Sequence, residues 1–323
     1  MGNPGRNHLL HIRRGVCHRT HFHLGQKKDN VMGVFRVTQF SDMHFCSNPE
    51  AAPRNTDDTW DAVFDDAFAS DRQLPDLVVI TGDIADNGTE AEYEKVAEKL
   101  SRLSVDAVVC PGNHDRQAPF DAILPRPGIS SGRTLRVGSW LFLFADSNAD
   151  GRDRRPDGSL VDREDRTHAH GRFGDAEVAW IVETVERSDA DHAFVWTHHP
   201  PGAFGFFGKE DHDAEFARLI DMAPSIRGVG AGHTHTNTTH ECAGRPVHQC
   251  PSLSTNLNLD EYTTLPPGYR TYEFSDDGTV TSEAHLVGEE QWPIYPLAEV
   301  TRRMLRGEIS FEEMMEQLAA ERA

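Results

Sequence analysis

The sequence repeatedly places residues that can bind a metal or move a proton directly after a short apolar run. The clearest case is the run 108–110, which stops at Pro111-Gly112 and is followed by Asn113, His114 and Asp115. Taken alone, this stretch could equally be a polar turn that closes a strand, because Asn, Asp and Gly all suit turns. Four other apolar runs end in the same way, with these candidates: Asp42 and His44; Asp83; His198; His233 and His235. The recurrence favours one shared site over five unrelated turns.

Short β-branched and aromatic runs alternate with helix-like segments along most of the chain. The runs predicted to be strands are 34–40, 77–80, 107–110, 141–144, 193–196 and 226–231. Apolar residues at helical spacing predict helices at 56–69, 90–103, 175–185 and 216–222. Three later runs are typical of antiparallel strands that close the sheets: 247–253, 269–274 and 280–287. The alternation indicates a layered α/β fold, in which residues beyond the carboxyl ends of the strands converge in one crevice.

The charge balance is strongly acidic outside the first 31 residues. The chain has 32 Lys and Arg against 52 Asp and Glu, a net charge of -20. Residues 1–31 hold six basic side chains and one acid, so the remainder carries 26 basic against 51 acidic groups. A GC-rich genome would explain why only five of the basic residues are Lys, but not the excess of acids. Such a surface suits the salt-rich cytoplasm of a halophile, and it disfavours binding to nucleic acid or anionic membranes.

Cysteine content and segment composition indicate the compartment and the domain limits. The five Cys form no CxxC pair, which argues against a disulfide framework or a thiolate zinc site and fits a reducing compartment. No apolar run approaches the ~20 residues needed to cross a bilayer. We expect residues 1–31 to be a mis-assigned start or a leader, followed by a catalytic domain at 32–287 and a helical tail at 288–323. Predicted helices at 297–305 and 311–322 suit packing on the domain or on a second subunit, as in a homodimer.

The residue types at the five strand ends make chemical sense together. They supply carboxylate, imidazole and amide groups without thiolate. This set favours Mn, Fe, Zn or similar ions with positions left open for water. The groups are too many for one catalytic ion, whereas two ions about 3.5–4 Å apart that share a carboxylate would use them all.

The order of the motifs along the chain is itself informative. It runs Asp-x-His, Gly-Asp, Gly-Asn-His-Asp, His-x-Pro and Gly-His-x-His. Over residues 34–287 this order resembles the calcineurin-like metallophosphoesterase family, and five motifs together are far more specific than any one of them. Within the family, the chain is most similar to the cyclic-nucleotide and glycerophosphodiester phosphodiesterases. This similarity rests on three motifs: Ser-Asp-x-His at the start, His-His-Pro-Pro, and Gly-His-Thr-His at the end. The resemblance implies a four-layer α/β/β/α sandwich of two mixed sheets flanked by helices.

The resemblance also implies a role for each motif residue. Three residues would hold the first metal ion, three others the second, and one carboxylate would bridge them: Asp42, His44 and His235; Asn113, His198 and His233; and Asp83. The ions would lower the pKa of the water between them, so that a hydroxide attacks phosphorus in line with the leaving oxygen. His114 would act on the leaving-group side, as an acid or a hydrogen-bond donor, and Asp115 would orient it.

Several residues compete with these assignments. His199 is the alternative to His198 as a ligand, but a His-x-Pro placement puts His198 at the strand end. His168 and His170 form a His-x-His, but they lie in the charged segment 148–172 without a preceding strand, so we interpret them as part of a solvated loop. Structural, surface or turn roles are expected for His240, His248, His285 and Asp146. Two interpretations stay open for three phenylalanines, stacking on a substrate base or packing under a loop: Phe204, Phe206 and Phe207.

Together these features predict a cytoplasmic enzyme that hydrolyses small phosphodiesters with two ions of Mn, Fe or Zn. Its expected partner is a small phosphoester substrate, with no nucleic-acid polymer and no membrane. A phosphomonoesterase or nucleotidase on the same fold is the alternative among enzymes. A metal-binding scaffold without catalysis is the alternative outside enzymes, although every expected group is present.

Overall fold

The computed structural model describes residues 33–46, 54–148, 171–203, 210–309, 313, 314 and 317. Residues Val31–Ala323 form one compact unit. Several sequence predictions lie outside the described residues: the extension 1–31, most of the segment 148–172 with His168 and His170, Phe204, Phe206 and Phe207, and most of the helix at 311–322.

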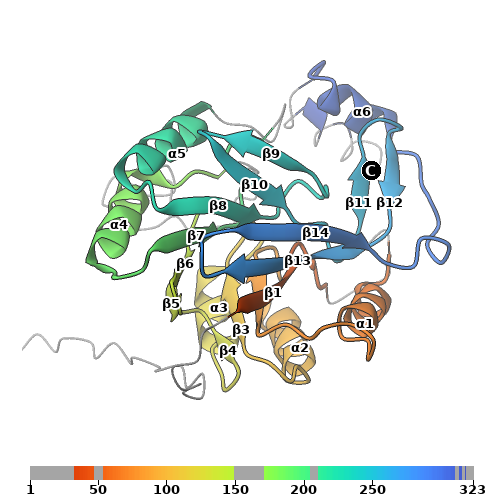
Figure 1. The fold of residues 1–323 in the computed structure, drawn as a ribbon. Helices are drawn as coiled ribbons and strands as arrows, with labels where there is room; N and C mark the ends of the chain where they lie inside the picture. Colours follow the sequence, from red (N-terminus) through yellow and green to blue (C-terminus); the bar gives the residue numbers. More distant parts are fainter. Residues whose placement is uncertain are drawn as a thin grey trace, which may run out of the picture. The chain divides into compact units, whose positions relative to one another are not determined.

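Two six-stranded sheets form the centre of the unit (Figure 1). In spatial order the first contains β14 (Val280–Leu286), β13 (Gly268–Ser275), β1 (Val34–Phe40), β2 (Leu77–Thr81), β3 (Ala107–Cys110) and β4 (Ile129–Ser130). The second contains β5 (Thr134–Val137), β6 (Trp140–Phe144), β7 (His192–Trp196), β8 (Ile226–Ala231), β10 (Arg245–Gln249) and β9 (Thr239–Cys242). Both sheets are mixed. In the first, β1 to β4 are parallel, and β13 and β14 form antiparallel pairs at one edge. In the second, β6, β7, β8 and β10 are parallel, and β5 and β9 are antiparallel at the two edges.

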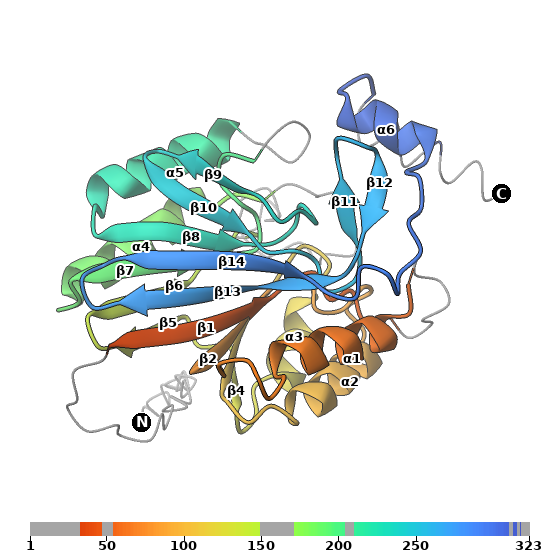
Figure 2. The same ribbon diagram turned by 45° about the vertical axis from the view of Figure 1, so that its right-hand side comes forward.

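Helices cover the outer face of each sheet (Figure 2). The first sheet packs against α1 (Thr56–Ala67), α2 (Glu90–Leu100) and α3 (Gln117–Ile123), and the second against α4 (Gly174–Arg187) and α5 (Glu210–Met222). Trp60 of α1 packs on Phe40 of β1, and Tyr93 of α2 is buried in the same core. Phe216 of α5 and Val195 of β7 are buried together in the core of the second sheet. Among the described residues, no helix has both the length and the apolar composition that crossing a membrane would need.

Aromatic side chains fill the space between the two sheets. Phe35 of β1 packs on Phe142 of β6 with ring centroids 5.7 Å apart, and Phe194 of β7 packs on Phe274 of β13 at 5.0 Å. Successive residues of a strand point to opposite faces, so the same strands supply both the inter-sheet core and the helix-facing cores. With helices outside and two sheets inside, the fold is the predicted four-layer α/β/β/α sandwich.

A buried glutamine fixes the two sheets against each other near the ends of β1 and β8. The Gln39 amide donates to the Thr81 hydroxyl at 2.7 Å and to the carbonyl of Ala231 at 3.2 Å. Its oxygen accepts the hydroxyl of Tyr272 at 2.6 Å. Because a buried polar network is stable only when its members are bonded, these contacts specify one alignment of the sheets. That alignment positions the loops that follow β1, β2 and β8.

The structure corrects some predicted boundaries and adds short elements. The strand predicted at 247–253 ends at Gln249, because Pro251 has no N–H for a sheet ladder and the chain turns toward the end of β1. The helix predicted at 216–222 begins earlier, at Glu210. β11 (Asn256–Asn258) and β12 (Thr263–Leu265) form a short hairpin. The later residue Tyr295 returns to β12, where its carbonyl accepts the N–H of Thr264 at 2.8 Å. The chain then forms α6 (Glu299–Leu305).

Candidate metal centre and active site

The candidate residues come from loops that follow β1, β2, β3, β7 and β8, and thus from both sheets. β1, β2 and β3 are mutually parallel, as are β7 and β8, so their carboxyl ends lie at a common edge. Four overlapping groups of potential metal ligands occur at this edge, and the ligand atoms within each group lie within 4.8 Å of one another. The groups are Asp42, His44 and His235; His44, Asp83 and His114; Asp42, Asp83 and His198; and His198, His199 and His233.

One half of the site joins the end of β1 to the loop after β8. His44 Nε2 lies 3.1 Å from His235 Nε2, and His235 Nε2 lies 3.4 Å from Asp42 Oδ1. The Asp42 carboxylate also accepts the backbone N–H of His233, at 3.0 Å and 2.9 Å to its two oxygens. Two imidazole nitrogens and a carboxylate oxygen therefore converge, a donor set that suits a transition metal ion.

Asp83 lies between this half of the site and the other. Its Oδ2 is 3.7 Å from His44 Nε2 and 3.3 Å from His198 Nε2. His198 Nε2 is in turn 3.1 Å from Asn113 Oδ1. A single carboxylate oxygen is thus near ligand atoms of both halves, which is the position that a shared ligand of two ions requires.

Backbone carbonyls set the orientation of two histidines. His198 Nδ1 lies 2.8 Å from the carbonyl of Thr81, and His235 Nδ1 lies 2.8 Å from the carbonyl of Thr255. A carbonyl can only accept, so Nδ1 carries the hydrogen in each ring, and in the neutral form that binds a metal the lone pair is on Nε2. Imidazole ligands in metal sites are usually oriented in this way, and in both rings Nε2 faces the other candidate groups.

The backbone at the candidate ligands adopts an uncommon conformation. Five of them have positive φ, a region that disfavours side chains with a Cβ: Asp42 at 50°, His44 at 46°, Asp83 at 48°, His233 at 71° and His235 at 53°. Such conformations persist where surrounding contacts impose them, and they concentrate at functional sites. Their coincidence with the motif residues supports this edge as the candidate functional site.

Two motif glycines are required because other site groups approach their backbone closely. A Cβ at Gly112 would collide with the carboxylate of Asp83, and a Cβ at Gly232 would collide with the hydroxyl of Ser41. The glycines of Gly-Asn-His-Asp and Gly-His-Thr-His therefore allow loops from different strands to meet.

Asp86, which the sequence analysis did not single out, holds two of the histidines. Its carboxylate lies 3.3 Å from His44 Nδ1, and its carbonyl accepts from His114 Nδ1 at 2.9 Å. The loop that carries it is anchored by the capping box of α2, in which Glu92 and Thr89 bond each other's backbone N–H. Only a Gly-Asp-x-x-Asp spacing before a capping box could have indicated this role.

Asp115 is fully buried and braces the loop after β2. Its carboxylate accepts the N–H groups of Gly112 at 2.9 Å, Ala85 at 3.2 Å and Ile84 at 3.3 Å, and the hydroxyl of Tyr93 at 3.0 Å. Burial, together with the charge of Asp83, raises the pKa of Asp115. The family resemblance implies that this residue orients His114. The bonds found here orient the neighbouring backbone, and the acceptor for the His114 ring comes from Asp86.

The electrostatics of the site favour bound positive charge. Burial alone would raise the pKa of Asp42, but the hydrogen bond and charge of His235 lower it to about 2. Burial opposes a charge on His198 as well, yet the neighbouring Asp83 raises its pKa to about 9. Burial raises the pKa of Asp83 too, but the charges of His198 and His114 hold it well below its usual range. Both carboxylates are thus ionised in a buried setting, which is stable only when a cation compensates them. The donor set and the charge both fit metal ions.

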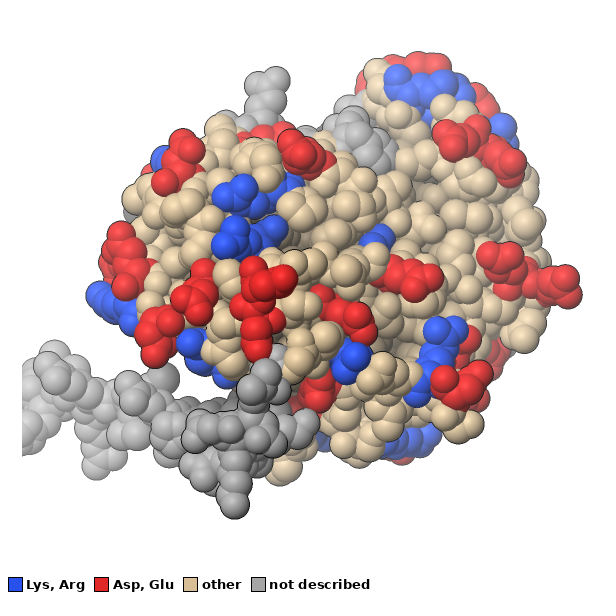
Figure 3. Space-filling view, in the orientation of Figure 1, with Lys and Arg blue, Asp and Glu red and all other residues tan. Residues whose placement is uncertain are grey.

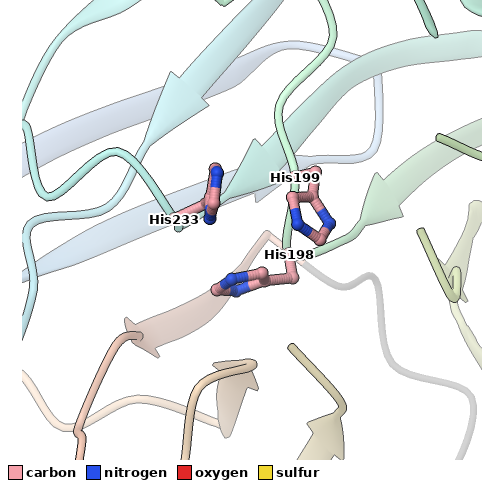
Figure 4. A group of neighbouring side chains, drawn as sticks. All are labelled: His198, His199 and His233. Carbon is pink, nitrogen blue, oxygen red and sulfur yellow. The ribbon is translucent and has the colours of Figure 1, made fainter. Parts of the chain in front are cut away.

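The competing histidines lie in different surroundings. His199 is buried beside His198 and His233 (Figure 4). His240 contacts the carbonyl of Pro201, and the others pack on aromatic rings away from the site: His248 against Tyr272, and His285 against Tyr269. Asp146 forms a turn, as expected, by accepting the N–H of Asn148 at 2.9 Å.

Comparison with known proteins decides the family. The model of the calcineurin-like phosphoesterase family matches residues 35–237, more than half of the chain. The chain belongs to this family. As a member of the calcineurin-like phosphoesterases, it is a hydrolase that acts on phosphoesters, and the groups of potential metal ligands described above lie within the matched region.

Individual relatives of the family agree with this placement. The chain is 27% identical to the 3',5'-cyclic adenosine monophosphate phosphodiesterase CpdA of Escherichia coli over 271 residues, or 80% of this chain and 91% of that protein. It is 28% identical to the glycerophosphodiester phosphodiesterase GpdQ of Enterobacter lignolyticus over 236 residues, covering 69% and 76%. Its fold is similar to that of a dimetal phosphatase from Danio rerio, with a TM-score of 0.52 and 15% identity over 79% of this chain and 100% of that one.

Proposed function

We propose that this calcineurin-like phosphoesterase uses two metal ions to hydrolyse a small phosphodiester of the cyclic-nucleotide or glycerophosphodiester type. One observation carries the dinuclear part: Oδ2 of Asp83 lies 3.7 Å from His44 Nε2 and 3.3 Å from His198 Nε2. Asp83 would bridge the ions, with the remaining ligands divided as follows: Asp42, His44 and His235 for the first, and Asn113, His198 and His233 for the second. Bound ions of this kind activate water and neutralise charge on phosphoryl oxygens.

His114 is the residue we assign to the leaving group. Its Nδ1–H donates to the Asp86 carbonyl, which leaves Nε2 for the substrate. Its backbone N–H donates to Asp83 Oδ1 at 2.8 Å, so the backbone that carries the ring is bonded to the proposed bridging residue. In its imidazolium form Nε2 would donate a proton or a hydrogen bond to the departing oxygen. A side chain 33% exposed, in a site whose ligands are mostly buried, suits a group that meets the substrate.

The preference for diesters rests on the relatives. CpdA and GpdQ are both named as phosphodiesterases. We expect the metal-reconstituted protein to hydrolyse bis-p-nitrophenyl phosphate with a kcat/KM at least about tenfold above that for p-nitrophenyl phosphate. Cyclic AMP and a glycerophosphodiester, assayed next, would then separate the two substrate types. Faster hydrolysis of the monoester would favour the alternative, a phosphomonoesterase or nucleotidase.

Replacing the shared carboxylate tests the dinuclear arrangement. Asp83→Asn keeps the shape of the side chain but removes its charge, so we expect weaker binding of both ions and a loss of at least about 100-fold in kcat. Metal content per chain and turnover are the measurements. Asp121→Asn, which changes an exposed acid on α3, is the matched control and should behave as the wild type. Two ions bound with normal turnover in Asp83→Asn would disprove the shared-ligand role.

A further inference from the structure

His199 is a buried histidine at the site that the proposed function leaves without a role. It is 3% exposed and follows His198 directly in the loop after β7. Figure 4 shows its ring beside that of His233, with His198 below. The ring centroid of His199 lies 4.4 Å from that of His233 and 4.8 Å from that of His198. One potential ligand atom from each of the three residues lies within 4.8 Å of the other two.

The ring of His199 is held in one orientation. Its Nδ1 lies 2.8 Å from the hydroxyl oxygen of Ser147, which also accepts the backbone N–H of His199 at 3.1 Å. Ser147 follows β6, the strand beside β7, so this contact joins the ends of two paired strands. A Cβ at Gly171 would collide with the His199 ring, which packs directly on the glycine backbone. The position of the second ring nitrogen, Nε2, is therefore fixed.

Nε2 of His199 is buried and has no hydrogen-bond partner within the described part of the chain. A buried polar atom in this state is unfavourable unless it gains a partner. His248 also buries its Nε2 in this way, but it belongs to none of the groups of potential metal ligands among the described residues. What distinguishes His199 is thus the pair of imidazoles beside it.

The spacing of the three histidines suits a common ion. Nitrogens bound to one ion at about 2.1 Å can be no more than about 4.2 Å apart. Ligand atoms within 4.8 Å of one another need to move by only a few tenths of an ångström to meet that limit. The movement is small compared with a change of rotamer, so the three rings are close to the arrangement that a shared ion needs.

We propose that His199 Nε2 is a further ligand of the ion that His198 and His233 hold. The inference depends on the proposed function in requiring an ion at that position. A third imidazole shifts the donor set toward nitrogen, so this position would favour Zn²⁺ or Co²⁺ over Mg²⁺, which prefers oxygen ligands. The two ions would accordingly differ in selectivity, because the half of the site with Asp42, His44 and His235 has two imidazoles.

Cobalt binding tests the proposal without relying on catalysis. Full-length protein is stripped of metal and titrated with Co²⁺, and the visible absorption spectrum and the bound ions per chain are recorded. We expect the wild type to bind two ions. In both His199→Gln and His199→Ala, one ion should bind at least about tenfold more weakly and its spectrum should change. His248→Gln, the matched buried histidine, should leave both unchanged, and circular dichroism establishes that each variant is folded.

A milder variant gives a second, independent measurement. Ser147→Ala keeps the His199 side chain but removes the hydroxyl that contacts its Nδ1 and its backbone N–H. The ring of His199 therefore gains freedom, and the same ion should bind several-fold more weakly. Unchanged affinity and spectrum in His199→Gln and His199→Ala would overturn the proposal, as would a wild type that binds fewer than two ions. Two bound ions without hydrolysis of either p-nitrophenyl ester would contradict the proposed function alone, and the cobalt measurement on His199 would still decide its role.

Discussion

At the scale of single residues, Asp86 orients one proposed ligand through its side chain and the proposed acid through its backbone. Asp86→Asn would weaken the acceptor at His44 Nδ1 but keep the carbonyl that His114 contacts. We expect a fall of about 10–100-fold in the affinity for Mn²⁺ at one site, which calorimetry measures, because partners of this kind orient the ligand. The control is Asp61→Asn, an exposed acid on α1. Equal affinity in both variants would show that the carboxylate does not orient His44.

His212 should make stability depend on pH. Burial lowers its pKa from 6.5 to about 4. Below pH 6.5 the unfolded chain takes up a proton that the folded chain refuses, so the free energy of unfolding falls from pH 6.5 to about 4 and then levels off. The decrease from this residue is up to about 3 kcal/mol. His212→Gln can still donate to the His199 carbonyl and should flatten the profile in that window, as urea unfolding at each pH measures; identical slopes would contradict the assignment.

The sequence was sufficient to predict which motif residues would meet, but not what supports them. Asp42, Asp83, Asn113 and His198 each follow a strand, and strand ends converge in this fold. The role of Asp86 depends on the path of the loop after β2, and that of Ser147 on the packing of β6 beside β7. Neither path leaves a periodic pattern in the sequence, so the orienting contacts required the structure.

At the scale of elements, the capping box of α2 links helix stability to the site. Thr89→Ala removes the N-cap and should lower the free energy of unfolding by about 1 kcal/mol, and it should also weaken metal binding because the cap anchors the loop with Asp86. Asn55→Ala removes the N-cap of α1. We expect a similar loss of stability there with unchanged metal affinity. Urea unfolding and a chelator competition assay measure the two effects; an equal loss of affinity in both variants would contradict the link.

Elements with a strong apolar pattern were the ones that the sequence could predict. β2 and β7 are apolar and buried along their length, and α4 carries an apolar stripe. The short α3 has Pro119 in its first turn and a single fully buried residue, and β9 alternates between exposed and half-buried positions at a sheet edge. These elements form because neighbouring strands and helices provide a surface for them, which no local pattern reports.

At the scale of the whole molecule, the acidic surface should make stability depend on salt. Acidic side chains lie over both sheets and near α6 on the face shown in Figure 3, with basic groups between them. Screening lengths fall from about 10 Å at 0.1 M salt to about 3 Å at 1 M, so we expect the melting temperature to rise with KCl. A variant with exposed acids neutralised should respond less: Asp58→Asn, Glu186→Gln, Asp221→Asn and Glu290→Gln. A melting temperature independent of KCl in the wild type would contradict the halophilic interpretation.

The division of the site between the two sheets also bears on how the protein unfolds. Asp42, Asp83 and Asn113 follow strands of one sheet, and His198 and His233 follow strands of the other. Nearby, the buried hydrogen bond from Gln39 to Ala231 joins the two sheets. Ions bound by residues of both sheets would link the two sheets to each other. Unfolding that separates the two sheets would then also release the ions. Buried amide hydrogens of either sheet exchange with solvent only after such unfolding, so their exchange rates would depend on the concentration of free metal.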